Sequence, residues 1–316
     1  MRFLVTGGAG FLGSALANRL AASGHDVIVL DDLSNGAARH LATAVTFHQG
    51  DVDSIPLLWS LLQGVDCVYH LAARVSVAQS ILYPRDYTRI NVGGTVSLME
   101  AMRDTGVRRV VFTSSGAIYG RQPRQRAQED DLPYPDSPYA VSKWAAEQYI
   151  NTIGSLWDIE TVSLRIFNAY GPRQSLPLSH APVVPRFLQQ ALTGGSLVIH
   201  GDGSQTRDYV YVADVVEALV RAATAVHVNR QIINVGSGVE TSLNQLVDEI
   251  EAATGRRADR LYNPSKSGGV PRLVADIGRA ADLLGFHPTT SLAAGLRQTI
   301  EEDERFSRKA RWSSGP

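Results

Sequence analysis

The segment RFLVTGGAGFLGSALANRLAAS, residues 2–23, decides the fold. It begins as an apolar strand and continues as an amphipathic helix, and Gly7, Gly10 and Gly13 stand where the strand must turn into the helix. A helix N-terminus presents unpaired backbone N–H groups, which bind a pyrophosphate when glycine lets it come close. The segment therefore predicts a dinucleotide site in an α/β domain. A glycine-rich turn without a ligand is the alternative.

The second predicted strand ends in Asp31 and Asp32, about 20 residues beyond the glycine loop. A carboxylate at Asp31 can accept hydrogen bonds from the adenosine ribose and repels a 2′-phosphate, so the sequence favours NAD over NADP. Asp32 has a second interpretation, as a residue that hydrogen-bonds the following turn. Asp51 and Val52 end the third predicted strand, where they can flank the adenine ring; an ordinary strand-end turn is the alternative.

Short runs rich in Val, Ile and Leu alternate with helix-length amphipathic segments along the chain. This rhythm predicts a doubly wound parallel sheet with helices on both faces, the Rossmann fold. A Pro- and Ser-rich stretch after Gly171 indicates that the chain leaves the sheet there, and QIINVGSG, residues 231–238, is expected to rejoin it. We predict an NAD-binding domain over residues 1–168 with 210–237, a smaller α/β substrate lobe over 169–209 and 238–305, and a loose tail over 306–316.

The composition is that of an ordinary soluble globular protein, with 44% apolar residues, 19% charged residues and a formal net charge of −1. This balance gives no general attraction to nucleic acid or to an anionic membrane. The chain starts directly with a strand, has no apolar run near the roughly 20 residues that span a bilayer, and has one cysteine, Cys67. We therefore expect a cytoplasmic protein that binds its ligand at a specific site without a metal.

A second group of residues has the character of a catalytic site. The strand VVFTSS, residues 110–115, brings Ser115 to a strand carboxyl end, where open α/β sheets bind ligands. Tyr139 and Lys143 are four residues apart in the helix expected after Pro138, so they share one face. An ammonium beside a phenol lowers its pKa, which makes Tyr139 a usable base while Ser115 hydrogen-bonds the reacting hydroxyl. A tyrosine and a lysine also occur at this spacing by chance, and the upstream glycine loop is what favours catalysis.

Seven motifs extend this reading over nearly the whole chain: TGGAGFLGS, LDDLS, HLAA, TSSGAIYG, YAVSK, RIFNAYGPRQ and GDGSQTRDYVYVAD. With them the chain resembles the extended short-chain dehydrogenases/reductases, and within these the NAD-dependent nucleotide-sugar epimerases and dehydratases, most specifically the UDP-hexose 4-epimerases. The resemblance implies the Rossmann fold, a tightly bound NAD and a nucleotide-diphosphate sugar as ligand. It also implies a homodimer, formed through the helix after Asn91 and the helix that carries Tyr139, whose apolar outer faces would otherwise be wet.

Carried over position by position, the resemblance makes Tyr139 the base, Lys143 its electrostatic partner and a ligand of the nicotinamide ribose, and Ser115 the hydroxyl donor. The expected cofactor residues are Gly7, Gly10, Phe11, Leu12, Gly13, Asp31, Asp32, Asp51, Val52, Leu71, Ala72, Ala73, Asn91, Thr113, Tyr139, Lys143 and Phe167. The expected substrate residues are Ser115, Asn168, Val184, Arg207, Lys266 and Leu273.

Several of these substrate positions carry a specific expectation. Asn168 and Arg207 match family positions that hold the diphosphate, and a guanidinium suits this because it binds phosphate oxygens bidentately. An ion pair with Asp208 is the alternative for Arg207. Lys266 stands where the family usually has an arginine, so it offers a point charge in place of a fork. Leu273 resembles the family's gate for hexose size, and leucine is intermediate between an aromatic residue that excludes N-acetyl sugars and a small one that admits them.

The residues after Ser115 bear on the reaction. The similar 4,6-dehydratases carry an Asp-Glu pair there and related decarboxylases keep the glutamate, whereas this chain has Gly116 and Ala117. We therefore expect C4 epimerisation of a nucleotide sugar, UDP-glucose or UDP-galactose first, through a transient 4-keto sugar. The alternatives are a UDP-glucuronate or UDP-N-acetylglucosamine 4-epimerase, a nucleotide-sugar reductase and, outside the enzymes, a dinucleotide-binding sensor or scaffold.

Overall fold

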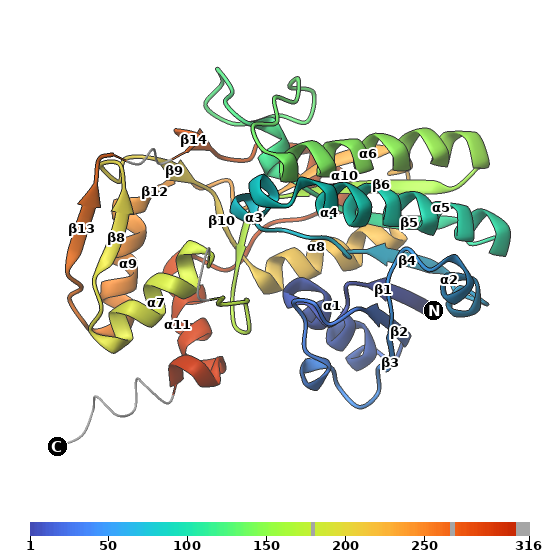
Figure 1. Cartoon of the computed structure of the whole chain (residues 1–316), viewed down its shortest axis with the longest axis horizontal. Helices are drawn as coiled ribbons and strands as arrows, with labels where there is room; N and C mark the ends of the chain where they lie inside the picture. Colours follow the sequence, from blue (N-terminus) through green and yellow to red (C-terminus); the bar gives the residue numbers. More distant parts are fainter. Residues whose placement is uncertain (178–180, 266–268, 308–316) are drawn as a thin grey trace.

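A seven-stranded parallel sheet forms the centre of the molecule (Figure 1). The computed structural model describes residues 1–177, 181–265 and 269–307. The strand order is β11-β6-β5-β4-β1-β2-β3, so the direction of winding reverses between β1 and β4, where open α/β sheets bind ligands. The strands are β1 (Arg2–Thr6), β2 (Asp26–Asp31), β3 (Thr46–Gln49), β4 (Cys67–His70), β5 (Arg109–Ser115), β6 (Glu160–Ile166) and β11 (Gln231–Val235).

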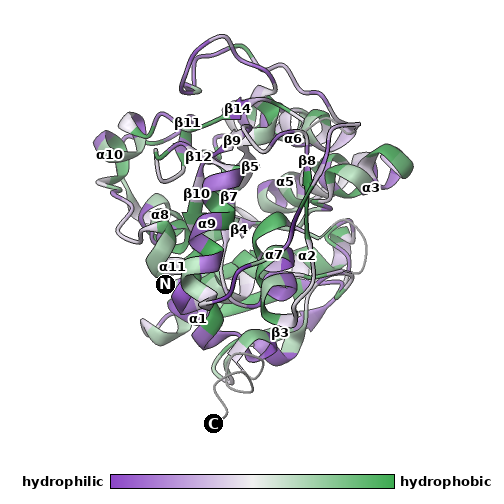
Figure 2. Cartoon of the chain, turned by 90° about the vertical axis from the view of Figure 1, so that its left-hand side faces the viewer, coloured by the Kyte–Doolittle hydropathy of each residue, from purple (hydrophilic) through white to green (hydrophobic). Residues whose placement is uncertain are grey.

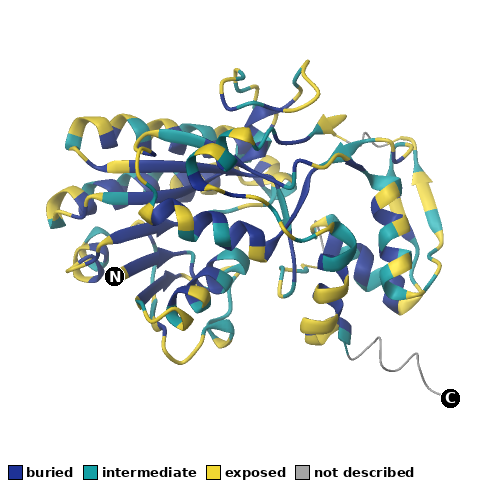
Figure 3. Cartoon of the chain, turned by 180° about the vertical axis from the view of Figure 1, so that it is seen from behind, coloured by how far each residue is buried: buried dark blue, intermediate teal, exposed yellow. Residues whose placement is uncertain are grey.

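Helices cover both faces of the sheet because its central strands are apolar on both sides. Leu4 and Ile28 belong to the core under one helix layer, and their neighbours Val5 and Val29 belong to the core under the other. One layer contains α2 (Ile55–Leu61), α5 (Gly94–Thr105) and α6 (Pro138–Trp157), and the opposite layer contains α1 (Phe11–Ala22) and α8 (Val212–Thr224). Figure 3 shows the strands buried and the outer sides of these helices exposed.

Smaller elements from the second half of the chain form a lobe at one side of the sheet (Figure 1). Hydrophobic and hydrophilic residues alternate along its helices (Figure 2), as is required of amphipathic helices packed on a core. The lobe contains α7 (Val183–Thr193), β8 (Leu197–His200), β9 (Thr206–Arg207), β12 (Thr241–Ser242), α9 (Leu243–Thr254), β13 (Arg260–Asn263), β14 (Arg272–Leu273) and α11 (Leu292–Glu302).

Short elements connect these two parts. They are η1 (Ala38–His40), α3 (Val77–Leu82), α4 (Pro84–Tyr87), the π-helical turn η2 (Thr88–Gly93), η3 (Gly116–Tyr119), β7 (Asn168–Tyr170), β10 (Tyr209–Tyr211) and α10 (Gly278–Leu284). β7 pairs with β10 in parallel, which places the end of the Rossmann sheet next to the strand that leads into α8.

The doubly wound parallel sheet confirms the predicted fold class. β11 lies beside β6 in that sheet, while the domain boundaries stay a prediction. One expectation for the C-terminal end is wrong: Phe306, assigned to a loose tail, is fully buried in the core. Asp303, itself buried, accepts hydrogen bonds from Arg173 N and from the Arg305 side chain, so this turn is fixed against the lobe. Residues 308–316 lie outside the described residues.

Two further observations hold for the described part of the chain. None of its helices combines the length and the apolar character needed to cross a membrane. Its His, Cys, Asp and Glu side chains form no group of three or more that could hold a metal ion.

Candidate active site

A cavity lies at the carboxyl edge of the sheet, around the reversal between β1 and β4. All the expected cofactor residues except Asn91 line it. The structure thus brings the glycine loop, the acidic strand end and the Ser-Tyr-Lys group to one cavity. The other lining residues were not predicted: Leu30, Ser34, Asn35, Gly36, Gly50, Arg74, Val75, Ile90, Ser114, Ile166, Ala169, Gln174 and Ser175.

The glycine loop fits a phosphate cradle because side chains there would collide with backbone. Gly7 has a left-handed φ of 68°, and a Cβ on it would lie 2.6 Å from Ala72 N. A Cβ on Gly13 would overlap the Gly7 carbonyl oxygen and lie 2.6 Å from Gly8 Cα. Gly10 precedes the first turn of α1, whose N–H groups have no partners within the helix. The loop therefore leaves N–H donors facing the cavity at the positive end of a helix dipole.

The acidic strand end is held rigidly at the cavity wall. Asp31 Oδ2 accepts a hydrogen bond of 2.9 Å from Ala9 N, and Oδ1 accepts one of 2.8 Å from Leu33 N. Burial raises the pKa of Asp31, and these backbone hydrogen bonds oppose the increase. Asp32 Oδ1 accepts from Ser34 N at 2.8 Å, which is the turn contact that the sequence offered as its alternative. Asp31 is therefore held at the cavity wall by the glycine loop and by the turn after β2.

The third strand end also combines a cavity contact with local bonds. Asp51 lines the cavity, and its Oδ2 lies 3.0 Å from Arg89 Nη1. Its Oδ1 accepts a hydrogen bond from Asp53 N at 3.0 Å, the strand-end turn named as the alternative. Val52 beside it is buried and lines the same part of the cavity.

Asn91, expected around the cofactor, is not among the residues that line the cavity. Its Nδ2 donates to Arg74 O at 3.0 Å and to Ser142 Oγ at 2.9 Å, and its Oδ1 accepts from Arg74 N at 2.8 Å. Nδ2 thus donates to two protein partners, and Oδ1 accepts from one. Asn91 therefore fixes the backbone of Arg74, and Arg74 is the residue that lines the cavity.

The three expected catalytic side chains meet between β5 and α6. Ser137 caps α6 by accepting a hydrogen bond from Ala140 N, so the helix starts with Tyr139 in its first turn. Ser115 and Tyr139 both line the cavity, and the Ser115 hydroxyl is near enough to the phenol to favour its ionised form. Lys143 is buried one turn further along, and its ammonium lies 4.3 Å from the centroid of the Phe112 ring. The arrangement can hold a substrate hydroxyl between a serine and a tyrosine.

The protonation of this group differs from the expectation that Lys143 lowers the pKa of Tyr139. Burial raises the pKa of Tyr139, and the nearby Ser115 hydroxyl only partly opposes this. Burial also lowers the pKa of Lys143 to about 7, with the negative charge of Glu147 acting in the opposite direction. Both shifts have the same cause, because removing water from either group disfavours its charged form. The proposed base therefore needs further positive charge beside it to ionise near neutral pH.

His70, at the end of β4, is a neighbour of the site that the sequence analysis missed. It is buried between Thr6 Oγ1, 2.8 Å from Nδ1, and Thr95 Oγ1, 2.9 Å from Nε2. Burial lowers the pKa of His70 to about 3, so the ring is neutral near pH 7. Its place in the HLAA motif was the available signal. The ring joins β1, β4 and α5.

Four expected substrate residues, Asn168, Val184, Arg207 and Leu273, do not line this cavity. Arg207 and Leu273 are register partners on the paired strands β9 and β14, and Leu273 packs against the cluster that contains Phe167. Asn168 begins β7, and Val184 is buried in α7. Lys266 lies outside the described residues. The lobe thus places Leu273 against the cluster to which Phe167, a residue of the cavity lining, belongs.

The Asp208 carboxylate does not form the ion pair with Arg207 that the sequence offered as an alternative. Asp208 accepts hydrogen bonds from Ser237 N, Gly238 N and Ala275 N. Arg207 Nη1 donates to the carbonyl oxygens of Thr206 and Val270, both at 2.7 Å. Asp208 therefore joins three lobe segments, while Arg207 belongs to a separate backbone contact.

Comparison with known proteins agrees with this geometry. The family model described as "NAD dependent epimerase/dehydratase family" matches residues 3–236. The chain is 42% identical over 308 residues to a UDP-glucose 4-epimerase of Mycolicibacterium smegmatis, covering 95% of this chain and 98% of that protein.

Solved structures give the same relationship at the level of the fold. The UDP-glucose 4-epimerase of Thermotoga maritima, determined with UDP-glucose, has a TM-score of 0.92 and 35% identity, covering 98% of this chain and 100% of that one. The UDP-glucose 4-epimerase of Thermus thermophilus, determined with NAD, has a TM-score of 0.88 and 35% identity, covering 95% and 98%.

Proposed function

The chain belongs to the NAD-dependent epimerase/dehydratase family, and on that premise we propose that it is an NAD-dependent UDP-hexose 4-epimerase. The observation that carries the proposal is the meeting of Ser115, Tyr139 and Lys143 with the glycine loop on one cavity. Gly7, Gly13 and Asp31 have the shape and the carboxylate that a dinucleotide requires. A sensor or scaffold would need the loop but would have no use for the Ser-Tyr-Lys group.

In this proposal Tyr139 takes the proton of the C4 hydroxyl while Ser115 holds that oxygen by a hydrogen bond. NAD, when bound, supplies the hydride acceptor and, through its oxidised ring, additional positive charge. Lys143 in its ammonium form supplies the neighbouring charge from the protein. The 4-keto sugar must then turn over within the lobe, so that hydride returns to the opposite face and Tyr139 gives the proton back.

The residues after Ser115 favour epimerisation over dehydration. A Cβ on Gly116 would lie 3.1 Å from the ring of Phe167, so an aspartate there would press against a residue of the cavity wall. Gly116 and Ala117 also supply no acid or base. Elimination of water needs both, whereas a redox cycle at C4 needs only Tyr139 and the hydride acceptor.

The substrate prediction follows from Leu273. We expect UDP-glucose and UDP-galactose to interconvert at C4, with kcat/KM at least about ten-fold above that for UDP-N-acetylglucosamine or UDP-glucuronate, because one ill-fitting group costs about 1–3 kcal/mol. Incubation with each UDP- and dTDP-sugar, followed by NMR of the C4 stereochemistry, measures this ranking. Comparable turnover of the N-acetyl sugar would overturn it. A dehydrated product, or a requirement for stoichiometric NADH, would instead remove the epimerase assignment.

We also propose a homodimer, on the basis of exposed apolar side chains along α3 and α6. Ile81, Leu82 and Tyr83 are 60–65% exposed at the end of α3, and Val141 and Tyr149 are 49% and 47% exposed on α6. α5, the other helix expected in the interface, has no large apolar side chain among these exposed ones. A single chain would leave this patch in water, and a second copy would cover it.

The dimer has a direct test in solution. Sedimentation equilibrium is expected to give the mass of two chains for the wild type and of one chain for Val141→Glu/Tyr149→Glu, because two carboxylates would have to be buried in the interface. Leu132→Glu, which changes an 81% exposed leucine elsewhere on the surface, is the matched control and should stay dimeric. A wild type with the mass of one chain at micromolar concentration would contradict the proposal.

A further inference from the structure

A buried ion pair lies on the helix that carries Tyr139 and Lys143. Glu147 on α6 and Arg165 on β6 are 0% and 2% exposed. Arg165 Nη2 lies 2.7 Å from Glu147 Oε1, and Nε lies 3.1 Å from Oε2, so the contact is bidentate. Taking two charges out of water is costly, and apolar residues of the same volume often stabilise a fold equally well. This cost favours a functional role of the pair in addition to its effect on the stability of the fold.

Glu147 is placed to act on Lys143. It follows Lys143 by four residues, so the two side chains share one face of α6. Lys143 forms no hydrogen bond within the part of the chain that the structure describes, and its ammonium contacts the Phe112 ring. Of the titratable groups that interact with it, His70 on β4 is neutral. Tyr139, one turn earlier on α6, lines the same cavity. Glu147 is the one whose negative charge opposes the loss of its proton.

Arg165 is itself held so that it cannot leave Glu147. Its Nη1 donates to Tyr119 Oη at 2.8 Å and to Glu129 O at 3.1 Å, and the guanidinium lies 4.8 Å from the centre of the Tyr119 ring. Tyr119 Oη then donates to Asn234 Oδ1 at 2.7 Å. Every polar group of the pair is therefore bonded on the protein side.

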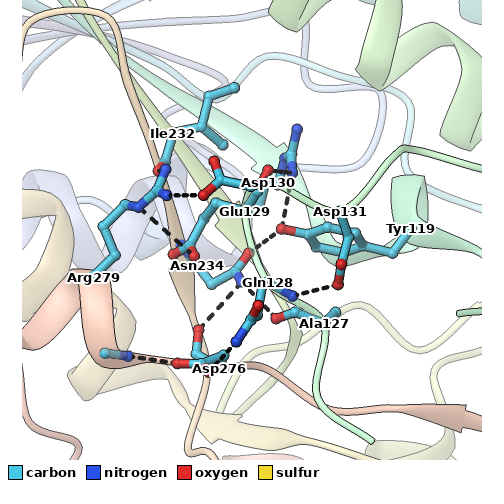
Figure 4. A network of polar contacts seen from close by, with 12 residues as sticks. Tyr119, Ala127, Gln128, Glu129, Asp130, Asp131, Ile232, Asn234, Asp276 and Arg279 are labelled. Atoms are coloured by element: carbon cyan, nitrogen blue, oxygen red, sulfur yellow. Dashed lines mark hydrogen bonds and ion pairs between the residues drawn. The ribbon is translucent and has the colours of Figure 1, made fainter. Parts of the chain in front are cut away.

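The network continues into the segment next to the substrate lobe. Figure 4 shows Asn234 between Tyr119, Ala127 and Asp276: its Nδ2 donates to Ala127 O at 2.9 Å and to Asp276 O at 3.2 Å. Glu129 accepts from Asn234 N at 2.8 Å. The position of Arg165 is thus fixed by both parts of the molecule.

We propose that Glu147, held by Arg165, is a positioning residue that retains the ammonium form of Lys143 beside Tyr139. The role assigned to Lys143 rests on the proposed function, whereas the action of Glu147 on its charge does not. Without the carboxylate, the buried ammonium would have an aromatic ring and a neutral histidine beside it but no negative charge. Lys143 would then release its proton at a lower pH, and the alkaline limit of activity would move down with it.

The test uses the holoenzyme with [ε-¹³C]lysine, which is practical because the other lysines of the chain are Lys266 and Lys309. Glu147→Gln leaves Arg165 buried without its partner and is expected to be destabilised. Glu147→Gln/Arg165→Met removes both charges, so it should recover the stability while still lacking the negative charge. Glu160→Gln, which breaks the ion pair of 2.9 Å between Arg109 and an exposed carboxylate, is the matched control.

In the double variant, the Lys143 resonance is expected to titrate lower by about half a pH unit or more, which is less than in Glu147→Gln because the like charge of Arg165 is lost together with the carboxylate, and the alkaline limb of kcat/KM is expected to shift equally. Glu160→Gln should leave both at their wild-type positions. Wild-type titration of Lys143 in the double variant would overturn the proposal and leave the pair a purely structural contact. If the NMR titration shifts in a protein that does not epimerise UDP-sugars, the assigned reaction fails and the electrostatic role of Glu147 stands.

Discussion

Tyr139→Phe is expected to lower kcat for UDP-glucose epimerisation by about 10²–10⁴-fold, the usual contribution of a positioned acid–base group. The phenol oxygen is the atom that would take the C4 proton, and the nearby Ser115 hydroxyl favours its ionised form. Phenylalanine keeps the ring, and with it the contact to Tyr87, whose ring centre lies 6.4 Å away. The loss should therefore appear in turnover while the amount of NAD released on denaturation stays at the wild-type level.

Tyr87→Phe provides the matched control on the adjacent ring. The Tyr87 hydroxyl donates to Ser76 O at 2.6 Å and points away from the reaction proposed at Tyr139, so its removal should change kcat by less than about ten-fold. Stopped assays at saturating UDP-glucose, with NAD content measured on the same preparations, give both quantities. Turnover of Tyr139→Phe within ten-fold of the wild type would show that another group moves the proton.

The cofactor half of the site was readable from sequence because its parts are local. Gly7, Gly10 and Gly13 act through backbone geometry over seven residues, and Asp31 follows at the end of the next strand. The pairing of β1 with both β2 and β4 then brings these ends together without further information. Residues at other strand ends, such as Thr113, reach the cavity for the same reason.

Residues that depend on side-chain partners were less predictable. Asn91 was expected at the cofactor, but it forms hydrogen bonds with Arg74 and Ser142 and does not line the cavity. No spacing in the sequence predicts such partners. His70 was missed because a histidine in an apolar run does not indicate which hydroxyls will satisfy it. Phe306 was assigned to a loose tail because the residues around it are mostly charged, although its own side chain is buried in the core.

The protonation of Tyr139 shows a different limit. Spacing predicts that Lys143 shares a face of the helix with Tyr139, and both residues line the cavity. It does not give the depth of burial, which raises the pKa of the phenol and lowers that of the amine. Sequence therefore supplied the candidate groups, and only the packed structure gives their charge and the importance of Glu147.

Gly13→Ala is expected to abolish NAD retention and, with it, nearly all epimerase activity. The new Cβ would overlap the Gly7 carbonyl oxygen and lie 2.6 Å from Gly8 Cα, and both are backbone atoms that cannot rotate away. The loop or the start of α1 has to move, which takes the N–H donors out of position for a pyrophosphate. Purified variant, denatured and assayed for released NAD, should contain less than about one tenth of the wild-type amount.

Gly93→Ala separates this collision from the general effect of adding a methyl group to a helix. Gly93 has a helical φ of −57°, and a Cβ there would meet no atom within 4 Å. Alanine is favoured over glycine inside a helix by about 1 kcal/mol, so propensity alone predicts that both variants gain stability. Only the Gly13 variant should lose NAD. If the Gly13 variant purifies with one NAD per chain, the loop can accommodate a Cβ at this position. The glycines would then not be required for the close approach of the backbone to the phosphates.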